Sequence, residues 1–230
     1  MTSHDAFADA GLLDTYVFDA YGTLFDVHSA VARLSERVGP DAEALSALWR
    51  VKQLEFSWVR TLASRHRNFA ALTEEALRYS LQRFPRVDAG LVPDLLEAYS
   101  KLDAYPDVRP TLLALRQRGV QLAILSNGTP DMLADAVDHA GLDGLFDAVL
   151  SVEAAGKFKT APETYALVTR HFGVSPARVS FQSSNGWDIA GATAFGFRTV
   201  WINRTGLPVE YEDLPPVAVL PSLSGLVQAA

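Results

Sequence analysis

Residues 16–25 read Tyr16-Val17-Phe18-Asp19-Ala20-Tyr21-Gly22-Thr23-Leu24-Phe25. The apolar character of residues 15–20 predicts a short buried strand. Such a strand would hold the Asp19 carboxylate at the carboxyl edge of a sheet, where clefts form in open α/β folds. Gly22 permits a tight turn after it, and the Thr23 hydroxyl can hydrogen-bond the carboxylate. Asp19 is therefore a candidate nucleophile.

The region that follows this strand has a helical pattern with no convincing strand, from about residue 26 to about residue 105. Its clearest helix follows Asp41, a candidate N-cap, because apolar residues then recur at three- and four-residue steps as far as Leu62. Further amphipathic runs cover residues 73–84 and 93–102. The predicted insertion is therefore entirely α-helical.

After residue 106, helices and strands alternate, which predicts a parallel sheet. We expect helices over 109–118, 130–139, 162–172 and 189–195, and strands over 120–125, 146–152, 179–181 and 198–202, with a possible strand over 217–220 and a weak closing helix. The predicted fold class is α/β. A Rossmann-like core of residues 1–25 and 106–230 is split by a helical cap subdomain of residues 26–105, whose ends cross near Phe25 and Tyr105 above Asp19.

Composition excludes several classes of function. The formal net charge of -7 gives no attraction to nucleic acid or to anionic membranes. The chain has no cysteine, so it has neither disulfides nor a catalytic thiol. The first residues show no secretory signal, and no uncharged apolar run approaches a membrane-spanning length. We therefore expect a cytoplasmic protein.

Polar segments stand at successive predicted strand ends: residues 19–23, Ser126-Asn127, Lys159 and residues 183–188. The carboxyl ends of parallel strands converge on one crevice, so these segments are expected to meet. Taken singly, a Ser-Asn pair is usually only a turn and a lysine is usually solvated. Their shared position favours a catalytic site.

These segments resemble the motifs of the haloacid dehalogenase superfamily, and specifically its metal-independent L-2-haloacid dehalogenases. Residues 183–188 are similar to that family's Ser-Ser-Asn-x-x-Asp motif, residues 126–128 to its Ser-Asn-Gly motif, and residues 49–55 to its cap-helix pattern Trp-Arg-x-Lys-Gln-Leu-Glu. The third motif commonly reads Lys-Pro with a tyrosine six residues after the lysine. Here Thr160 replaces the proline, but Tyr165 keeps the spacing, so Lys159 rather than Lys157 matches.

The resemblance implies a hydrolase that converts short (S)-2-haloalkanoic acids or haloacetates into 2-hydroxy acids and halide. The implied reaction passes through an aspartyl ester with inversion at C2, needs no metal or other cofactor, and takes place in a homodimer. The catalytic candidates are Asp19, Thr23, Arg50, Asn127, Lys159, Tyr165, Ser183, Asn185 and Asp188. The substrate-binding candidates are Tyr21, Leu24, Leu54, Phe69, Ser126 and Trp187.

Several of these residues have a role implied by the resemblance. Arg50 accepts the halide with Asn127 beside it, and a fixed guanidinium suits an anion that gains charge as its bond breaks. Asp188, oriented by Asn185, is the leading candidate to activate water. It is also a candidate N-cap for the following helix, and the two roles can coexist. The split of this task between Asp188 and Lys159 stays open.

The substrate is expected to lie between a polar end and an apolar wall. Its carboxylate would bind Ser126 and backbone N–H groups around Tyr21 and Leu24. The wall would consist of the side chains Tyr21, Leu54, Phe69 and Trp187. For Leu54 and Phe69, plain core packing is an equally good interpretation.

Two other functions remain as alternatives. A metal-dependent phosphatase of the same superfamily would need a Mg²⁺ cage and an acid two residues after the nucleophile. That position holds Tyr21. A non-catalytic binding protein on this fold is the other alternative, because fold does not fix function. The five histidines lie outside every motif and are expected to be surface or packing residues.

Overall fold

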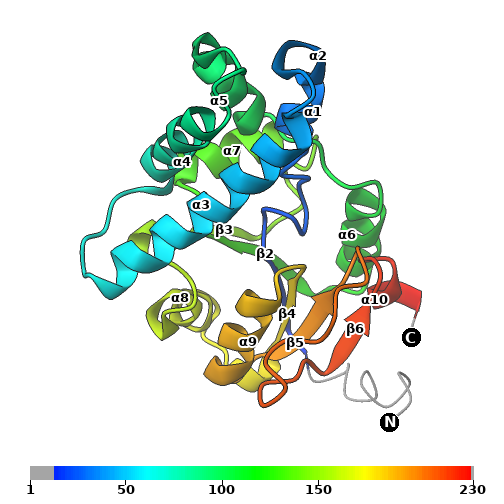
Figure 1. The fold of residues 1–230 in the computed structure, drawn as a ribbon. Helices are drawn as coiled ribbons and strands as arrows, with labels where there is room; N and C mark the ends of the chain where they lie inside the picture. Colours follow the sequence, from blue (N-terminus) through cyan, green and yellow to red (C-terminus); the bar gives the residue numbers. More distant parts are fainter. Residues whose placement is uncertain (1–12, 229–230) are drawn as a thin grey trace.

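A computed structural model describes residues 13–228 of the chain (Figure 1). The predictions that fall on residues 1–12, namely the lack of a secretory signal and of a role for His4, lie outside the described residues. The centre of the molecule is a six-stranded sheet in the order β3-β2-β1-β4-β5-β6, and every neighbouring pair is parallel. Its strands are β1 (Thr15–Phe18), β2 (Gln121–Ser126), β3 (Ala148–Ser151), β4 (Val179–Ser183), β5 (Arg198–Ile202) and β6 (Ala218–Leu220). The predicted α/β class with a parallel sheet is confirmed.

The register of the sheet explains why the polar segments meet. All of β1 is buried, and Phe18 pairs with Ile124 of β2 and with Gln182 of β4. The Asp19 amide then donates to the Gln182 carbonyl at 2.9 Å. Asp19 therefore emerges between two neighbouring strands at the carboxyl edge of the sheet, where a cleft is expected.

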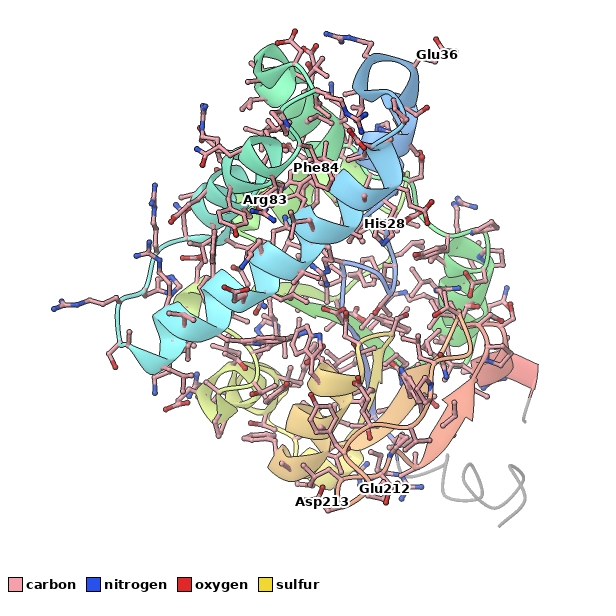
Figure 2. The ribbon with its side chains drawn as sticks, viewed as in Figure 1. His28, Glu36, Arg83, Phe84, Glu212 and Asp213 are labelled. Atoms are coloured by element: carbon pink, nitrogen blue, oxygen red, sulfur yellow. The ribbon has the colours of Figure 1, made fainter. Side chains whose placement is uncertain are left out.

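The helices fall into two groups along the chain. The first group lies between β1 and α6 and gathers in the upper part of Figure 1: α1 (Ser29–Arg33), α2 (Ser35–Val38), α3 (Ala42–Leu62), α4 (Phe69–Arg83) and α5 (Val92–Ser100). The second group is interleaved with the strands: α6 (Val108–Gln117), α7 (Pro130–His139), α8 (Pro162–Phe172), α9 (Gly186–Phe195) and α10 (Gly225–Gln228). Figure 2 shows Arg83 and Phe84 near the first group and Glu212 and Asp213 at the opposite end of the molecule.

The chain enters and leaves the first helical group through two adjacent segments. The Asp26 amide donates to the Asp103 carbonyl at 2.8 Å, and the Tyr105 amide donates to the Leu24 carbonyl at 3.0 Å. This pairing lies where the crossing between core and cap was predicted. The division into subdomains at residues 25 and 105 itself stays a prediction.

Some element boundaries differ from the predicted ones. Helix α4 begins at Phe69, four residues before the predicted start at residue 73, because the Asn68 side chain caps it by accepting from the Ala71 amide at 2.9 Å. Asp41 does precede α3, but it makes no capping bond; its carboxylate binds Arg86 instead. Within residues 13–228, no helix is long and apolar enough to cross a membrane.

Candidate active site

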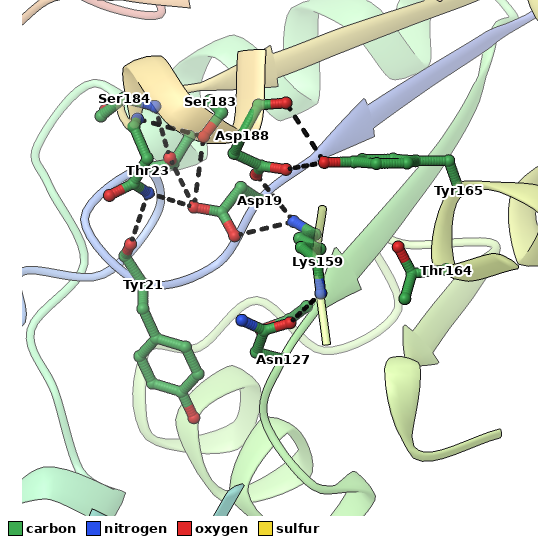
Figure 3. Close-up of polar contacts among 12 residues, drawn as sticks. Asp19, Tyr21, Thr23, Asn127, Lys159, Thr164, Tyr165, Ser183, Ser184 and Asp188 are labelled. Carbon is green, nitrogen blue, oxygen red and sulfur yellow. Dashed lines mark hydrogen bonds and ion pairs between the residues drawn. The ribbon is translucent and has the colours of Figure 1, made fainter. Parts of the chain in front are cut away.

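The Asp19 carboxylate is the centre of a buried hydrogen-bond network (Figure 3). Its Oδ2 atom accepts from the Asn185 side-chain Nδ2 at 2.8 Å, from the Thr23 hydroxyl at 3.1 Å and from the Ser183 hydroxyl at 3.4 Å. Its Oδ1 atom accepts from the Lys159 ammonium at 3.0 Å. The two oxygens are therefore unequally engaged: Oδ2 is held by neutral donors, and Oδ1 faces a cation.

Lys159 joins the nucleophile to a second carboxylate. Its Nζ atom donates to Asp188 at 2.8 Å as well as to Asp19, and the Lys159 and Asp188 side chains are both fully buried. The Tyr165 hydroxyl donates to the other Asp188 oxygen at 2.8 Å. Lys157 is exposed and binds Glu163, so the structure brings Lys159, and not Lys157, to Asp19. The interpretation of Lys159 as a solvated loop residue is wrong.

Burial and shared charge shift the pKa values of this cluster. Burial raises the pKa of Asp188 to about 6; the nearby Lys159 opposes that shift, and Asp19 adds to it. Burial alone would lower the pKa of Lys159, but the negative charges of Asp188 and Asp19 outweigh it, so that pKa is raised. Burial, reinforced by Asp188, also raises the pKa of Tyr165 well above its usual value. Lys159 is thus a fixed cation, whereas Asp188 titrates near neutrality.

The segments at the ends of β1 and β4 supply further parts of the polar shell. The Thr23 hydroxyl accepts from the Ser184 amide at 2.8 Å, and the Ser183 hydroxyl accepts from the Asn185 amide at 3.1 Å. These bonds fix both hydroxyls toward Asp19. Asp188 lies inside the first turn of α9 and Asn185 occupies the position before the helix, so the interpretation of Asp188 as an N-cap is wrong.

Asn127 and Ser126 form the turn after β2. The Asn127 side-chain oxygen accepts from the Lys159 backbone amide at 3.0 Å, so Asn127 positions the lysine loop. The buried Ser126 hydroxyl oxygen accepts from the Gly128 amide at 3.2 Å, which leaves its own proton available to donate.

Arg50 reaches this site from α3. Its Nη2 atom donates to the Tyr21 carbonyl at 3.2 Å and to the Asn185 side-chain oxygen at 3.3 Å. Arg50 was expected beside Asn127, but its hydrogen-bond partners belong to the turns after β1 and β4. The guanidinium retains further N–H groups, because it carries five donors.

The predicted wall around the substrate is aromatic at its centre. The Tyr21 ring stacks on Tyr99 of α5 with centroids 5.5 Å apart and lies 6.0 Å from Phe69 of α4. A side chain at Gly128 would come within 2.9 Å of the Tyr21 ring, so only glycine leaves room for this packing. Tyr21 and Phe69 are buried, and Leu54 is half-buried on α3.

Leu24 does not offer the backbone amide predicted for it. Its N–H donates to the Ala20 carbonyl at 2.9 Å within the turn, and its side chain is fully buried in the core. Among the residues described, the Tyr21 amide makes no hydrogen bond to a protein acceptor, and the same holds for the neighbouring Ala20 amide.

Trp187 of α9 is half-buried. Its ring meets Trp58 of α3 edge-on, with centroids 5.6 Å apart. Both tryptophans line a largely apolar groove of about 810 Å³ between α3 and α9, which Lys159 also lines.

Two residues near the site were not predicted. Tyr99 stacks on Tyr21 across a long sequence separation, and no local pattern signals it. Arg204 donates to the Thr23 carbonyl at 2.9 Å and pairs with Asp107 at 3.0 Å, so it braces the turn that holds Asp19. Arg204 lies two residues after the predicted strand 198–202, so the strand-end rule could have found it. Within residues 13–228, no three or more His, Cys, Asp or Glu side chains are grouped to hold a metal ion.

Comparisons with known proteins agree with this geometry. The family model described as haloacid dehalogenase-like hydrolase matches residues 13–196. The chain is 48% identical over 211 residues to (S)-2-haloacid dehalogenase 4A of Burkholderia cepacia, covering 91% of both chains. It is 46% identical to (S)-2-haloacid dehalogenase 1 of Pseudomonas sp. strain CBS-3, over 92% of this chain and 94% of that one.

A solved structure is also similar. It is the L-2-haloacid dehalogenase of Xanthobacter autotrophicus with chloropropionic acid covalently bound, with a TM-score of 0.86 and 39% identity over 94% of this chain and 97% of that one. The chain therefore belongs to the haloacid dehalogenase-like hydrolases and, among them, to the L-2-haloacid dehalogenases.

Proposed function

We propose that this protein is a hydrolytic (S)-2-haloacid dehalogenase that converts short (S)-2-haloalkanoic acids or haloacetates into 2-hydroxy acids and halide. The observation that carries the proposal is the Asp19 carboxylate, held at the carboxyl edge of the sheet with Lys159 on one oxygen and three neutral donors on the other. The relatives named (S)-2-haloacid dehalogenase support the substrate class.

The first step is a displacement at C2 of the substrate. Asp19 Oδ1 is the less engaged oxygen, so it attacks C2 from the side opposite the halogen, and the C2–halogen bond breaks with inversion. The product of this step is an ester between Asp19 and the substrate carbon. The covalently bound chloropropionic acid in the Xanthobacter relative supports such an intermediate.

The polar shell binds the two anions of this step. The Arg50 guanidinium accepts the departing halide, because a permanent cation stabilises the charge that develops on it. The Ser126 hydroxyl and the free Tyr21 amide bind the substrate carboxylate. Tyr21, Phe69 and Leu54 enclose the carbon chain, and Trp187 closes the wall on the side of the groove.

The second step is hydrolysis of the ester. Water attacks the Asp19 carbonyl carbon and gives a proton to Asp188. The bond between Cγ and Oδ1 of Asp19 then breaks, and the leaving alkoxide takes that proton to become the hydroxyl of the product, while the water oxygen replaces Oδ1 in the Asp19 carboxylate. Asp188 is suited to this task because its pKa near 6 lets it gain and lose a proton around neutral pH. Lys159 faces Oδ1, remains charged and stabilises the alkoxide that leaves on that oxygen. The donors of Asn185, Thr23 and Ser183 stabilise the oxyanion that develops on Oδ2. Asn127, Tyr165 and Asn185 hold these groups in place.

The phosphatase alternative fits the site poorly. The Tyr21 side chain stands where a second acid would be needed, and it points into a buried aromatic cluster. The Lys159 ammonium already pairs with both Asp19 and Asp188, which are the carboxylates a Mg²⁺ ion would need. Metal independence stays a prediction. The non-catalytic alternative has no observation in its favour.

Halide release tests the proposal directly. Purified protein should release chloride from (S)-2-chloropropionate but not from the (R) enantiomer, and prolonged EDTA treatment should not reduce the rate. A small-molecule phosphatase would instead hydrolyse p-nitrophenyl phosphate, lose activity in EDTA and recover it with Mg²⁺. Failure to release halide from any short 2-haloacid would refute the assignment.

We further propose that the enzyme is a cytoplasmic homodimer with residues 26–105 as its cap, as its resemblance to the family implies. The net charge of -7 supports the absence of nucleic acid and membrane partners. Sedimentation velocity should give a species of twice the 25.0 kDa chain mass.

A further inference from the structure

One carboxylate outside the catalytic cluster joins the first helical group to the core of the molecule. Glu153 follows β3 and lies 84 positions after Phe69 in the sequence. Its Oε1 atom accepts from the Phe69 amide, the first residue of α4, at 3.2 Å. Its Oε2 atom lies 2.9 Å from His66 Nε2, where the imidazole N–H can donate. Two donors of the α3–α4 connection therefore converge on one side chain of the core.

The same segment connects back to the active site. The Glu153 amide donates to the Ser151 hydroxyl at 3.2 Å, and that hydroxyl donates to the Gly128 carbonyl at 2.6 Å. The Tyr21 ring packs closely against Gly128, and the same ring contacts Phe69. The contacts thus form a closed circuit from the catalytic turn through Glu153 to Phe69 and back to Tyr21.

We infer that Glu153 is a positioning residue that latches the α3–α4 connection to the core and so sets Phe69 against Tyr21 over the bound substrate. The inference rests on the proposed function, in which the Phe69 side chain is part of the wall that encloses the substrate. The first amides of a helix have no partner inside the helix, so a carboxylate placed on one is favourable. At the other end of the helical group, residues 26 and 103 pair with each other, so the latch and this crossing hold it at two separate points.

A second contact reinforces the latch. The Phe158 amide donates to the Thr61 hydroxyl at the end of α3 at 3.0 Å, and the His66 ring lies 5.0 Å from the Phe158 ring. Phe158 directly precedes Lys159. Loss of the latch would therefore loosen the wall without removing any group that touches the reacting atoms.

Trypsin can report on the latch without reference to activity. Arg65 and Arg67 flank His66 and are exposed, so opening of this connection should speed cleavage after them. Cleavage after the exposed Arg86, which pairs with Asp41 away from the latch, reports on general loosening. The variants are Glu153→Ala, which removes the acceptor, Glu153→Gln, which keeps an acceptor oxygen for the Phe69 amide, and Glu163→Ala. Glu163 is the matched control, because it forms an exposed ion pair with Lys157 only.

For Glu153→Ala we expect cleavage after Arg65 and Arg67 to be about tenfold faster, with cleavage after Arg86 unchanged. KM for (S)-2-chloropropionate should rise by a similar factor, about tenfold, while kcat stays within about twofold. Glu153→Gln should restore most of both effects, and Glu163→Ala should match the wild type. Unchanged cleavage at Arg65 and Arg67, an equal increase at Arg86, or an unchanged KM would overturn the latch. Failure of the proposed function would give a different result. The wild-type protein would release no halide, while Glu153→Ala would still be cleaved faster than wild type after Arg65 and Arg67.

Discussion

Two buried carboxylates share the single positive charge of Lys159. Asp19 and Asp188 both accept from its ammonium, so the trio carries a net negative charge inside the protein. Burial disfavours the charged form of Asp188, the more deeply buried carboxylate, and the negative charge of Asp19 adds to this effect, so its pKa is raised to about 6 although Lys159 opposes the shift. Breaking such a cluster leaves a buried charge without its partner, so the cluster is far more sensitive to substitution than an exposed ion pair.

The raised pKa of Asp188 predicts the pH dependence of turnover. If ionised Asp188 activates water, kcat should rise with pH through an apparent pKa of about 6 that belongs to the coupled cluster. Stability should change in the opposite sense. The folded state binds this proton more tightly than the unfolded state, so the Asp188 contribution to the free energy of unfolding falls as pH rises from 3.8 to about 6. The measurement is halide release against pH for wild type and Asp188→Asn, which should lose the acid limb and about 10²-fold or more in kcat.

The control for this experiment is Asp94→Asn, because Asp94 forms an exposed ion pair with Arg37. This variant should keep the wild-type profile. A wild-type kcat that is flat between pH 5 and pH 7, or an acid limb that survives in Asp188→Asn, would show that another group is the base.

The helices of this protein differ in how well the local sequence predicts their ends. Helix α8 begins at Pro162 and ends at Phe172 as predicted, because proline at the first turn and the glycine after the last are local signals. The start of α4 was missed, although Asn68 is a good capping residue, because the apolar period becomes regular only farther on. Helices α1 and α2 are too short for any period. The catalytic cluster was predictable because its residues stand at strand ends, whereas Glu153 and Tyr99 act through contacts between distant segments.

The proposed role of Arg50 as halide acceptor depends on its position on helix α3. Arg50 on α3 reaches the turns after β1 and β4 through long hydrogen bonds of 3.2 Å and 3.3 Å, which a departing halide could replace. Arg50→Lys should lower kcat by about 10²-fold or more, because a compact ammonium lacks the reach and fork of the guanidinium. The control is Arg60→Lys on the same helix, where Arg60 pairs only weakly with Glu75 at 3.4 Å, and it should retain nearly all activity. Near-normal kcat in Arg50→Lys would show that Arg50 is not the halide acceptor.

At the scale of the whole molecule, the position of the site follows from topology. The parallel sheet brings Asp19, Ser126 and Ser183 to one edge, and the chain leaves for the first helical group directly after the nucleophile. That group returns beside its own starting point, so Arg50 and Phe69 contact Tyr21, two residues after Asp19. The result is a reacting carboxylate that is 5% exposed, which favours a two-step reaction with little competing water during the first displacement.

The two-step reaction can be followed through its oxygen atoms. With enzyme in excess over (S)-2-chloropropionate in H₂¹⁸O, the first turnover should give (R)-lactate whose new hydroxyl oxygen is unlabelled, because that oxygen comes from Asp19. Water then attacks the ester carbonyl, so the peptide containing Asp19 should gain ¹⁸O, and lactate from later turnovers should carry the label. Mass spectrometry of product and peptide measures both. Labelled lactate on the first turnover together with an unlabelled Asp19 peptide would mean that water attacks C2 directly, with Asp19 as its base.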